Sequence, residues 1–102
     1  MNVVELERNI EVAVALLKAL SNEKRLQILC ALYRAEKSVG ELEKIVGISQ
    51  SSLSQHLARL RRDGLVRTRR NAQSIHYSLS DRATEAVLKT LYELYCPEKN
   101  PS

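Results

Sequence analysis

A short turn between two helical patterns near the middle of the chain constrains the fold more than any other feature. Ser38 and Glu41 have the spacing of a capping box, in which each side chain binds a backbone amide of the first helical turn. A short helix therefore begins there. Gly47 permits a left-handed stop, and Ser49 is placed to cap the helix that follows. Two helices joined by so short a turn predict a helix-turn-helix over residues 38–63.

The second of these helices, expected over Gln50–Asp63, has one leucine face and one polar face. Its buried positions recur at steps of four and three, and they are Leu53, Leu57 and Leu60. Glutamine can contact adenine through two hydrogen bonds, and serine can reach a phosphate or a base edge. We therefore expect the helix to enter the major groove of duplex DNA. Its candidate contacts are Ser49, Gln50, Ser51, Ser52, Ser54, Gln55, His56 and Arg59, the arginine to a phosphate.

His56 has an alternative role, because it lies between the polar and the apolar face of this helix. The alternative to a DNA contact is that His56 is a hydrogen-bonded helix residue whose ionisation has no role.

Two strand patterns follow the helix, over residues 65–68 and 74–79, and both alternate with period two. They predict a hairpin, or wing, over residues 65–79.

The tip of this wing is basic. Its candidate DNA contacts are Arg69, Arg70, Asn71 and Gln73. Arginines in such a position can lie along a phosphate strand or enter a narrow minor groove, which adds affinity more than sequence choice. A merely solvated arginine-rich loop is the alternative.

Helices with apolar stripes are expected at both ends of the chain. Apolar residues recur at steps of three and four from Val3 to Leu20, and another helix is capped by Ser21-Asn22 and runs to about Ala35. The last helix is capped by Ser80-Asp81 and stopped by Pro97, with its apolar side formed by Ala83, Val87, Leu91, Leu94 and Tyr95. A chain of 102 residues has little else to cover these stripes. We expect a homodimer through residues 1–20 and 80–96.

Composition narrows the class of protein. The net charge is +4, and six arginines fall within residues 59–70, which fits a polyanionic partner. No nucleophile with an adjacent base, no paired carboxylates and no Gly-rich phosphate loop occur, so an enzyme is not expected. Met1–Glu5 does not begin a signal peptide, and no apolar run reaches the roughly 18 residues of a membrane span. We expect a cytoplasmic protein without membrane contact. A protein-binding module with the same fold is a further alternative.

Together these segments resemble the ArsR/SmtB family of winged-helix regulators. The resemblance covers nearly the whole single-domain chain, 1–102, and rests on Leu20–Leu29, Val39–Leu42, Ser49–Leu57 and Leu60–Val66. It implies a mainly α fold with a small β-hairpin: four helices, two strands and a last helix. It also implies a homodimer joined by the first and last helices, an imperfect inverted repeat in promoter DNA as its site, and release by an inducer.

Two cysteines bear on which inducer this is. Metal-sensing members of the family carry a Cys-rich motif in the third helix, or Asp and His ligands in the last. This chain has neither, so we expect no metal and no other cofactor. Cys30 lies in the second helix and Cys96 ends the last, and the family topology makes these helices neighbours. The pair resembles the branch of the family that senses oxidants and reactive sulfur, in which a persulfide or oxidant links two thiols and lowers DNA affinity.

The thiols also have an inert interpretation. Cys30 shares an apolar stripe with Leu26, Leu29 and Tyr33, so it can be a small core residue. A metal-responsive or signal-independent repressor with inert thiols is therefore the alternative. Arg34, one turn after Cys30, is expected to favour its thiolate, whereas the helix C-terminus disfavours a thiolate at Cys96. On this ground Cys30 is expected to attack first. The sequence does not decide between direct repression and displacement of another silencer.

Overall fold

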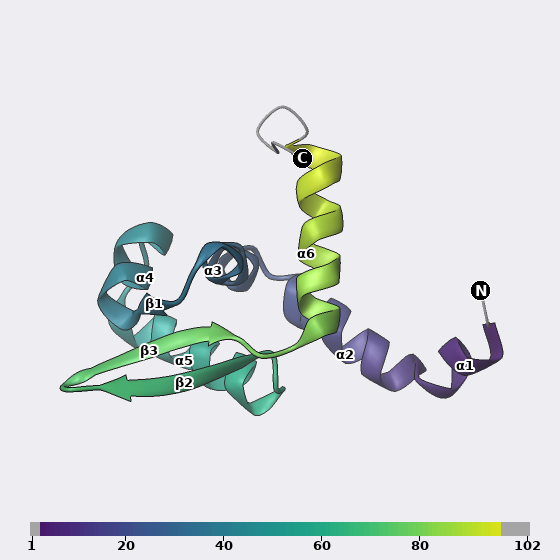
Figure 1. The fold of residues 1–102 in the computed structure, drawn as a ribbon, viewed down its shortest axis with the longest axis horizontal. Coiled ribbons are helices and arrows are strands. Elements are labelled where there is room, and N and C mark those ends of the chain that lie inside the picture. Colours follow the sequence, from purple (N-terminus) through teal and green to yellow (C-terminus); the bar gives the residue numbers. More distant parts are fainter. Residues whose placement is uncertain (1–2, 97–102) are drawn as a thin grey trace.

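The structure is a computed structural model that describes residues 3–96, which form six helices and one three-stranded antiparallel sheet (Figure 1). The elements in chain order are α1 (Val3–Arg8), α2 (Ile10–Leu20), α3 (Glu23–Arg34), β1 (Lys37–Ser38), α4 (Val39–Val46), α5 (Gln50–Arg62), β2 (Val66–Asn71), β3 (Ser74–Leu79) and α6 (Arg82–Tyr95). This confirms the mainly α fold with a small hairpin. It adds one short strand and one helix to the expected elements.

Side-chain caps fix where four of the helices begin, as the sequence predicts. Asn22 accepts from the Arg25 amide at 3.0 Å, and Ser38 and Glu41 form the full capping box of α4. Ser49 caps α5, Asp81 caps α6, and Gly47 ends α4 with a left-handed φ of 70°. Pro97, the expected stop of the last helix, lies outside the described residues.

The N-terminal helix differs from the prediction of one helix from Val3 to Leu20. Asn9 divides it into α1 and α2 with φ −106° and ψ 18°. The Asn9 side-chain amide donates to the Glu5 carbonyl at 2.9 Å. An asparagine that binds the backbone of its own turn competes with regular helix geometry, and this accounts for the break.

The sheet has the strand order β1-β3-β2, and its hairpin is longer than predicted. Residues 69–71, expected in the loop, continue β2, so Arg69 pairs with His76 and Arg70 with Ile75. The turn is left to Ala72 and the residue after it, and Ala72 has φ 57°. A two-residue hairpin turn that matches the strand twist needs such left-handed backbone. β1 is two residues long, too short for an alternation pattern to show.

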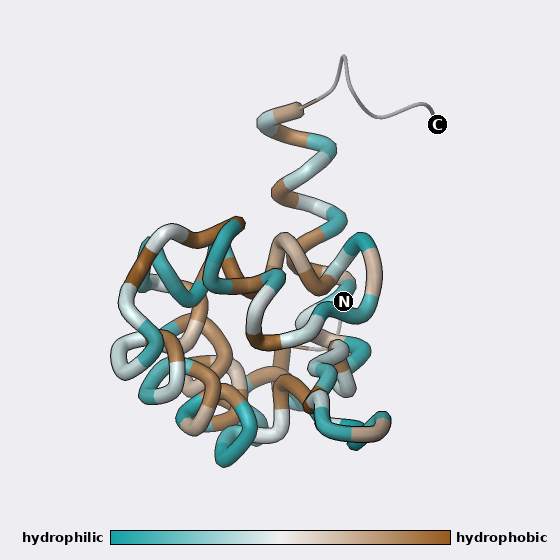
Figure 2. The backbone as a smooth tube through the Cα atoms, turned by 90° about the vertical axis from the view of Figure 1, so that its left-hand side faces the viewer, coloured by the Kyte–Doolittle hydropathy of each residue, from teal (hydrophilic) through white to brown (hydrophobic). Residues whose placement is uncertain are grey.

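One apolar core joins the helices to the base of the sheet. The leucines predicted to be buried in α5 are buried, at 0–2% exposure for Leu53, Leu57 and Leu60. The other buried apolar residues are Ala19, Leu20, Ile28, Leu29, Ala31, Leu32, Leu42, Val46, Leu65, Val66 and Leu88. Figure 2 shows apolar segments gathered in the body of the molecule, with α6 standing out from it.

The buried faces of α3 and α6 differ from the predicted stripes. In α3 the predicted Leu29 is buried together with the adjacent Ile28 and Leu32, whereas Leu26, Cys30 and Tyr33 are half-buried. In α6 only Thr84 and Leu88 are buried, and the end of the predicted stripe is open to solvent. The cause is visible in Figure 1, where α6 projects away from the body, so that its end extends beyond the rest of the described chain.

Candidate nucleic-acid interface and dithiol

The polar face of α5 is exposed, and its residues divide into two groups. Ser49 accepts from the Ser52 amide at 3.2 Å, and its hydroxyl also contacts the hydroxyls of Ser51 and Ser52 at 3.4 and 3.0 Å, so these three side chains serve the cap. The other group is free: within residues 3–96 no hydrogen bond is formed by the side chains of Gln50, Ser54 and Gln55. Unpaired amide and hydroxyl groups on an exposed helix are suited to reading base edges.

His56 and Arg59 lie off this face, in a charged cluster between α5 and α3. Burial, followed by the positive charges of Arg25 and Arg59, lowers the pKa of His56, so its neutral form is favoured. The Arg59 Nε is buried without a hydrogen bond and lies 3.7 Å from the Asp63 carboxylate. Their half-buried side chains leave both residues only partly open to DNA, and His56 forms no side-chain hydrogen bond within residues 3–96.

Arg25 anchors this cluster and was not predicted. It is 9% exposed, and its Nε and Nη2 donate to the carbonyls of Ala19 and Lys18 at 2.9 and 3.0 Å. A guanidinium on the last carbonyls of a helix satisfies acceptors that have no partner within that helix. Arg25 therefore fixes the end of α2 to α3.

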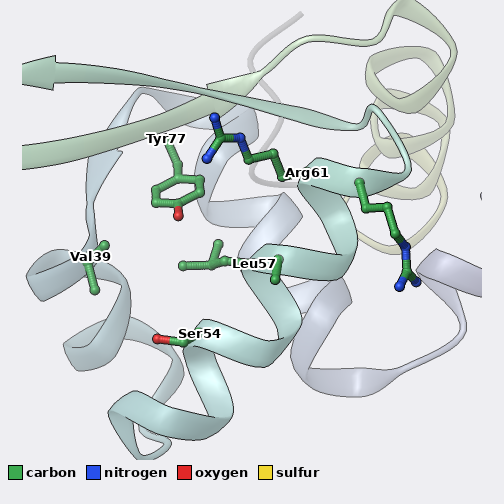
Figure 3. Close-up of a pocket in the computed structure, with 7 residues that line it drawn as sticks. Val39, Ser54, Leu57, Arg61 and Tyr77 are labelled. Atoms are coloured by element: carbon green, nitrogen blue, oxygen red, sulfur yellow. The ribbon is translucent and has the colours of Figure 1, made fainter.

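A cleft of about 480 Å³ separates α5 from the sheet (Figure 3). The Tyr77 hydroxyl points into it from β3, above Leu57, and Ser54 borders it from α5. Arg61 reaches beside the Tyr77 ring. The cleft thus presents cationic and hydroxyl donors next to the polar face of α5, which are the donor types that bind phosphate oxygens.

Sequence reasoning missed Tyr77 and Arg61 as candidate contacts. Strand alternation places Tyr77 on one side of β3, but it does not show that α5 lies on that side. The arginine run shows that Arg61 adds positive charge, but the sequence does not show that Arg61 lines a cleft.

The wing presents its candidate residues in different states. Arg69 is held by Glu36, whose two carboxylate oxygens accept its Nε at 3.1 Å and its Nη2 at 2.5 Å. That hydrogen bonding lowers the pKa of Glu36 and raises the pKa of Arg69. Arg70, Asn71 and Gln73 are exposed at the end of the hairpin, and their side chains form no hydrogen bond to the described part of the chain.

The two cysteines are free thiols on α3 and at the end of α6, and these helices are neighbours, as the family resemblance implies. Tyr33 of α3 stacks on Tyr92 of α6 with ring centroids 6.1 Å apart, one turn from each cysteine. Burial, and then the Cys96 thiol, raises the pKa of Cys30. The expectation that Arg34 would favour the Cys30 thiolate is therefore wrong, because desolvation of the half-buried sulfur raises its pKa.

Solvent reaches Cys30 through a groove of about 430 Å³. Residues of α3, α4 and α6 line it, among them Leu26, Ile45 and Tyr92. A small sulfur compound can therefore meet the thiol without unfolding of the core.

Large apolar side chains remain uncovered at both ends of the described chain. On α6 they are Leu94 and Tyr95, at 64% and 76% exposure. On α1 and α2 they are Val3, Val4, Leu6, Ile10, Val12, Val14 and Leu17, at 41–70% exposure. Exposed apolar side chains of this kind are typical of protein–protein interfaces.

Within residues 3–96, no group of three or more His, Cys, Asp or Glu side chains is arranged to hold a metal ion. None of the helices in that range combines the length and the apolar character that a bilayer crossing requires.

Comparison with known proteins identifies similar chains over most of the length. Residues 22–68 match the family model described as bacterial regulatory protein, arsR family. The transcriptional activator HlyU of Vibrio cholerae is 56% identical over 96 residues, which are 94% of this chain and 89% of that protein.

Solved structures agree with this. The transcriptional repressor BigR from Xylella fastidiosa superposes with a TM-score of 0.88 at 41% identity, covering 94% of this chain and 98% of that one. A homodimeric winged helix-turn-helix DNA-binding domain of a possible ArsR-family regulator from Mycobacterium bovis gives a TM-score of 0.76 at 25% identity, over 86% of this chain and 82% of that one.

Proposed function

Because the chain belongs to the ArsR family of bacterial regulatory proteins, it is a DNA-binding transcriptional regulator, and we propose that its DNA affinity is switched by Cys30 and Cys96. In this proposal a homodimer binds an inverted repeat in duplex promoter DNA. A persulfide or another oxidant then links the two thiols and weakens that binding. The protein acts in the cytosol, where thiols are reduced at rest.

The homodimer is supported by the uncovered apolar surface of α1, α2 and α6, which belongs to residues 1–20 and 80–96. A second copy of the chain carries the same surface, and a two-fold interface joins identical patches. The Mycobacterium bovis relative is named as homodimeric. A dimer of this kind presents two copies of α5 to DNA, and its two-fold symmetry predicts an inverted repeat with half-sites about 34–36 Å apart.

The observation that carries DNA binding is the exposed polar face of α5 over a fully buried leucine face. We assign residues 38–63 as the helix-turn-helix and 65–79 as the wing of a single domain, 1–102. Gln50, Ser54 and Gln55 are free to meet base edges. The cleft beside Tyr77 and the exposed end of the wing are placed for phosphates.

The proposed switch is a two-step sulfur transfer. One cysteine thiolate takes the outer sulfur of an organic persulfide, R–S–SH, forming a cysteine persulfide and releasing the thiol R–SH. The second cysteine attacks the inner sulfur, which forms a disulfide between Cys30 and Cys96 and releases hydrogen sulfide. Two thiols are oxidised, and one sulfane sulfur is reduced to sulfide. Where the Cα atoms lie beyond about 7 Å, each cysteine first takes one sulfur from a separate persulfide, and attack of one cysteine persulfide on the inner sulfur of the other forms a longer trisulfide bridge and releases hydrogen sulfide.

The link would act on DNA binding through helix positions. It fixes the end of α6, part of the proposed dimer surface, to the middle of α3. Arg25 joins α3 to the end of α2, which belongs to the same surface. A new covalent constraint between these helices therefore changes the spacing of the two α5 helices, and both must match the major groove at once.

The experiment is a footprint and an affinity measurement on the promoter region of the protein's own gene, with reduced protein and with protein treated with an organic persulfide. We expect a symmetric protected site and about a ten-fold loss of affinity on treatment, within the usual range of coupling between sites. Mass spectrometry should find the link within one chain. Cys30→Ser and Cys96→Ser variants are the matched controls and should keep their affinity.

Three results would count against the proposal. Absence of preference for any fragment over random duplex would refute sequence-specific binding. Equal affinity of treated and reduced wild-type protein would support the inert-thiol alternative. A partner whose binding does not depend on salt would favour a protein-binding module, because phosphate contacts make log affinity fall by about 0.9 per neutralised phosphate with log salt.

A further inference from the structure

A carboxylate at the base of the wing holds one of the wing's two adjacent arginines. Glu36 precedes β1, and both of its oxygens accept from Arg69, at 3.1 Å from Nε and at 2.5 Å from Nη2. A guanidinium presents its donors as a planar fork that fits either a carboxylate or a phosphate. The edge of Arg69 that binds Glu36 is therefore not available to DNA at the same time.

The strand register explains how residues 33 positions apart come to meet. His76 of β3 pairs with Arg69 on one side and with Ser38 on the other, so the three residues form one row across the sheet. Glu36 lies two residues before Ser38, and alternation in an extended chain returns it to the same face. The Glu36 carboxylate reaches past His76, whose Nδ1 is 4.0 Å from Oε1, to Arg69. The contact therefore links the segment before β1 to β2, and β1 and β2 are the two outer strands.

Arg70, the next residue, is not bound by a carboxylate of the described chain. Its cross-strand partner is Ile75, so its side chain leaves the sheet on the other face. This is also the face of Tyr77, which lines the cleft beside α5. Arg70 is exposed and, within residues 3–96, forms neither an ion pair nor a hydrogen bond through its side chain.

We propose that Glu36 limits the DNA affinity of the protein by occupying Arg69, so that each wing contributes one phosphate-binding arginine instead of two. Glu36 is thus a positioning residue that acts through Arg69. The inference rests on the proposed function, because the contact affects affinity only if the wing meets DNA.

The test is Glu36→Gln, which keeps the shape of the side chain and removes its charge. Affinity for the footprinted duplex is measured against salt concentration. Each released arginine should steepen the slope of log affinity against log salt by about 0.9, or about 1.8 for a dimer, which corresponds to about thirty-fold tighter binding at 0.15 M salt. Arg69→Gln alone should leave the wild-type slope unchanged. The same substitution in the Glu36→Gln background should abolish the gain.

Glu43→Gln is the matched control for general charge removal. Glu43 borders a surface cavity with Gln50 and Gln73, so it is near the candidate DNA contacts, but no arginine pairs with it in the described chain. We expect it to leave the salt slope at the wild-type value. Glu36→Asp keeps the charge but shortens the side chain, and it should shift the slope in the direction of Glu36→Gln. Circular dichroism and thermal unfolding verify that each variant is folded.

An unchanged slope in Glu36→Gln would overturn the inference, as would a wild-type slope that falls by about 1.8 when Arg69 is replaced. Equal effects of Glu36→Gln and Glu43→Gln would also overturn it. Failure of the proposed function has a different signature, because the wild-type protein itself would then prefer no fragment over random duplex.

Discussion

The helices α5 and α6 have similar lengths, 13 and 14 residues, and both are amphipathic, but the chain covers the apolar face of only one of them. Every leucine of the α5 stripe is buried, and apart from Ala58 the exposed residues are polar. In α6, Leu88 is buried, whereas Leu94 and Tyr95 near its end are largely exposed. A helix whose apolar face is already buried can present its polar face to a polar partner. An uncovered apolar face favours an apolar partner, so the chain presents two exposed helix surfaces of opposite chemistry.

The largest expected effect is on folding stability and concerns α5, whose apolar face is buried. Leu57→Ala should lower the free energy of unfolding by about 3 kcal/mol, because it leaves a cavity in a core where Leu57 is 2% exposed. Urea denaturation followed by circular dichroism measures this. Ile45→Ala is the matched truncation at a site that is 53% exposed, and it should cost less than about 0.5 kcal/mol. Equal costs would show that the burial of Leu57 does not determine its contribution to stability.

The next effect is on dimer dissociation and concerns α6, whose apolar end is exposed. Leu94→Asp should raise the dissociation constant of the dimer about a hundred-fold, or about 2.8 kcal/mol, because each copy then buries a carboxylate in an apolar contact. Sedimentation equilibrium gives the constant. Lys89→Asp introduces the same group elsewhere on the exposed surface of α6 and should change it less than about three-fold. A monomeric wild-type protein would refute this prediction.

A smaller effect separates base contacts from phosphate contacts. Gln55→Ala should cost about ten-fold in affinity for the footprinted site and leave the salt slope unchanged, because a glutamine reads a base edge and carries no charge. Arg70→Gln should lower affinity for all duplexes alike and reduce the slope by about 0.9 per protomer. Competition between specific and random duplex at several salt concentrations distinguishes them. A Gln55→Ala variant with unchanged specificity would contradict the assignment of the polar face.

The smallest effect is the pH dependence of stability at the edge of α5. Burial lowers the pKa of His56 in the folded chain below the ordinary histidine value of about 6.5, so the unfolded chain binds the proton more tightly. The contribution to stability is therefore present above pH 6.5 and is lost as the pH falls through the lower, folded-state pKa. The urea midpoint of the wild type should fall in this range more than that of His56→Gln. Parallel curves for the two proteins would show that His56 does not contribute.

Local rules predicted much of this fold, because each depends on residues within about four positions. The caps at Asn22, Ser38, Ser49 and Asp81 are where the sequence placed them, and so are the α5 leucines. The break at Asn9 was missed, although its side-chain bond is also local, because the apolar repeat on both sides of it is continuous.

Contacts between distant segments were not predictable in the same way. The Glu36–Arg69 pair and the Tyr77 cleft depend on a strand order that no linear pattern shows. The direction of the Cys30 pKa shift was predicted wrongly for the same reason. The sequence shows the neighbouring Arg34, but it does not show that Cys30 is half-buried. The buried faces of α3 and α6 were predicted from periodicity alone, which gives a stripe but not what covers it.

The uncovered end of α6 also links the behaviour of the protein to its abundance. When a second copy is the cover, folding stability rises with the concentration of the chain, as it does for any ligand that binds only the native state. Two protomers are then consumed for every occupied site, so occupancy of a promoter follows a steeper curve than simple proportion to protein level. A modest change in synthesis or turnover would be amplified at the gene.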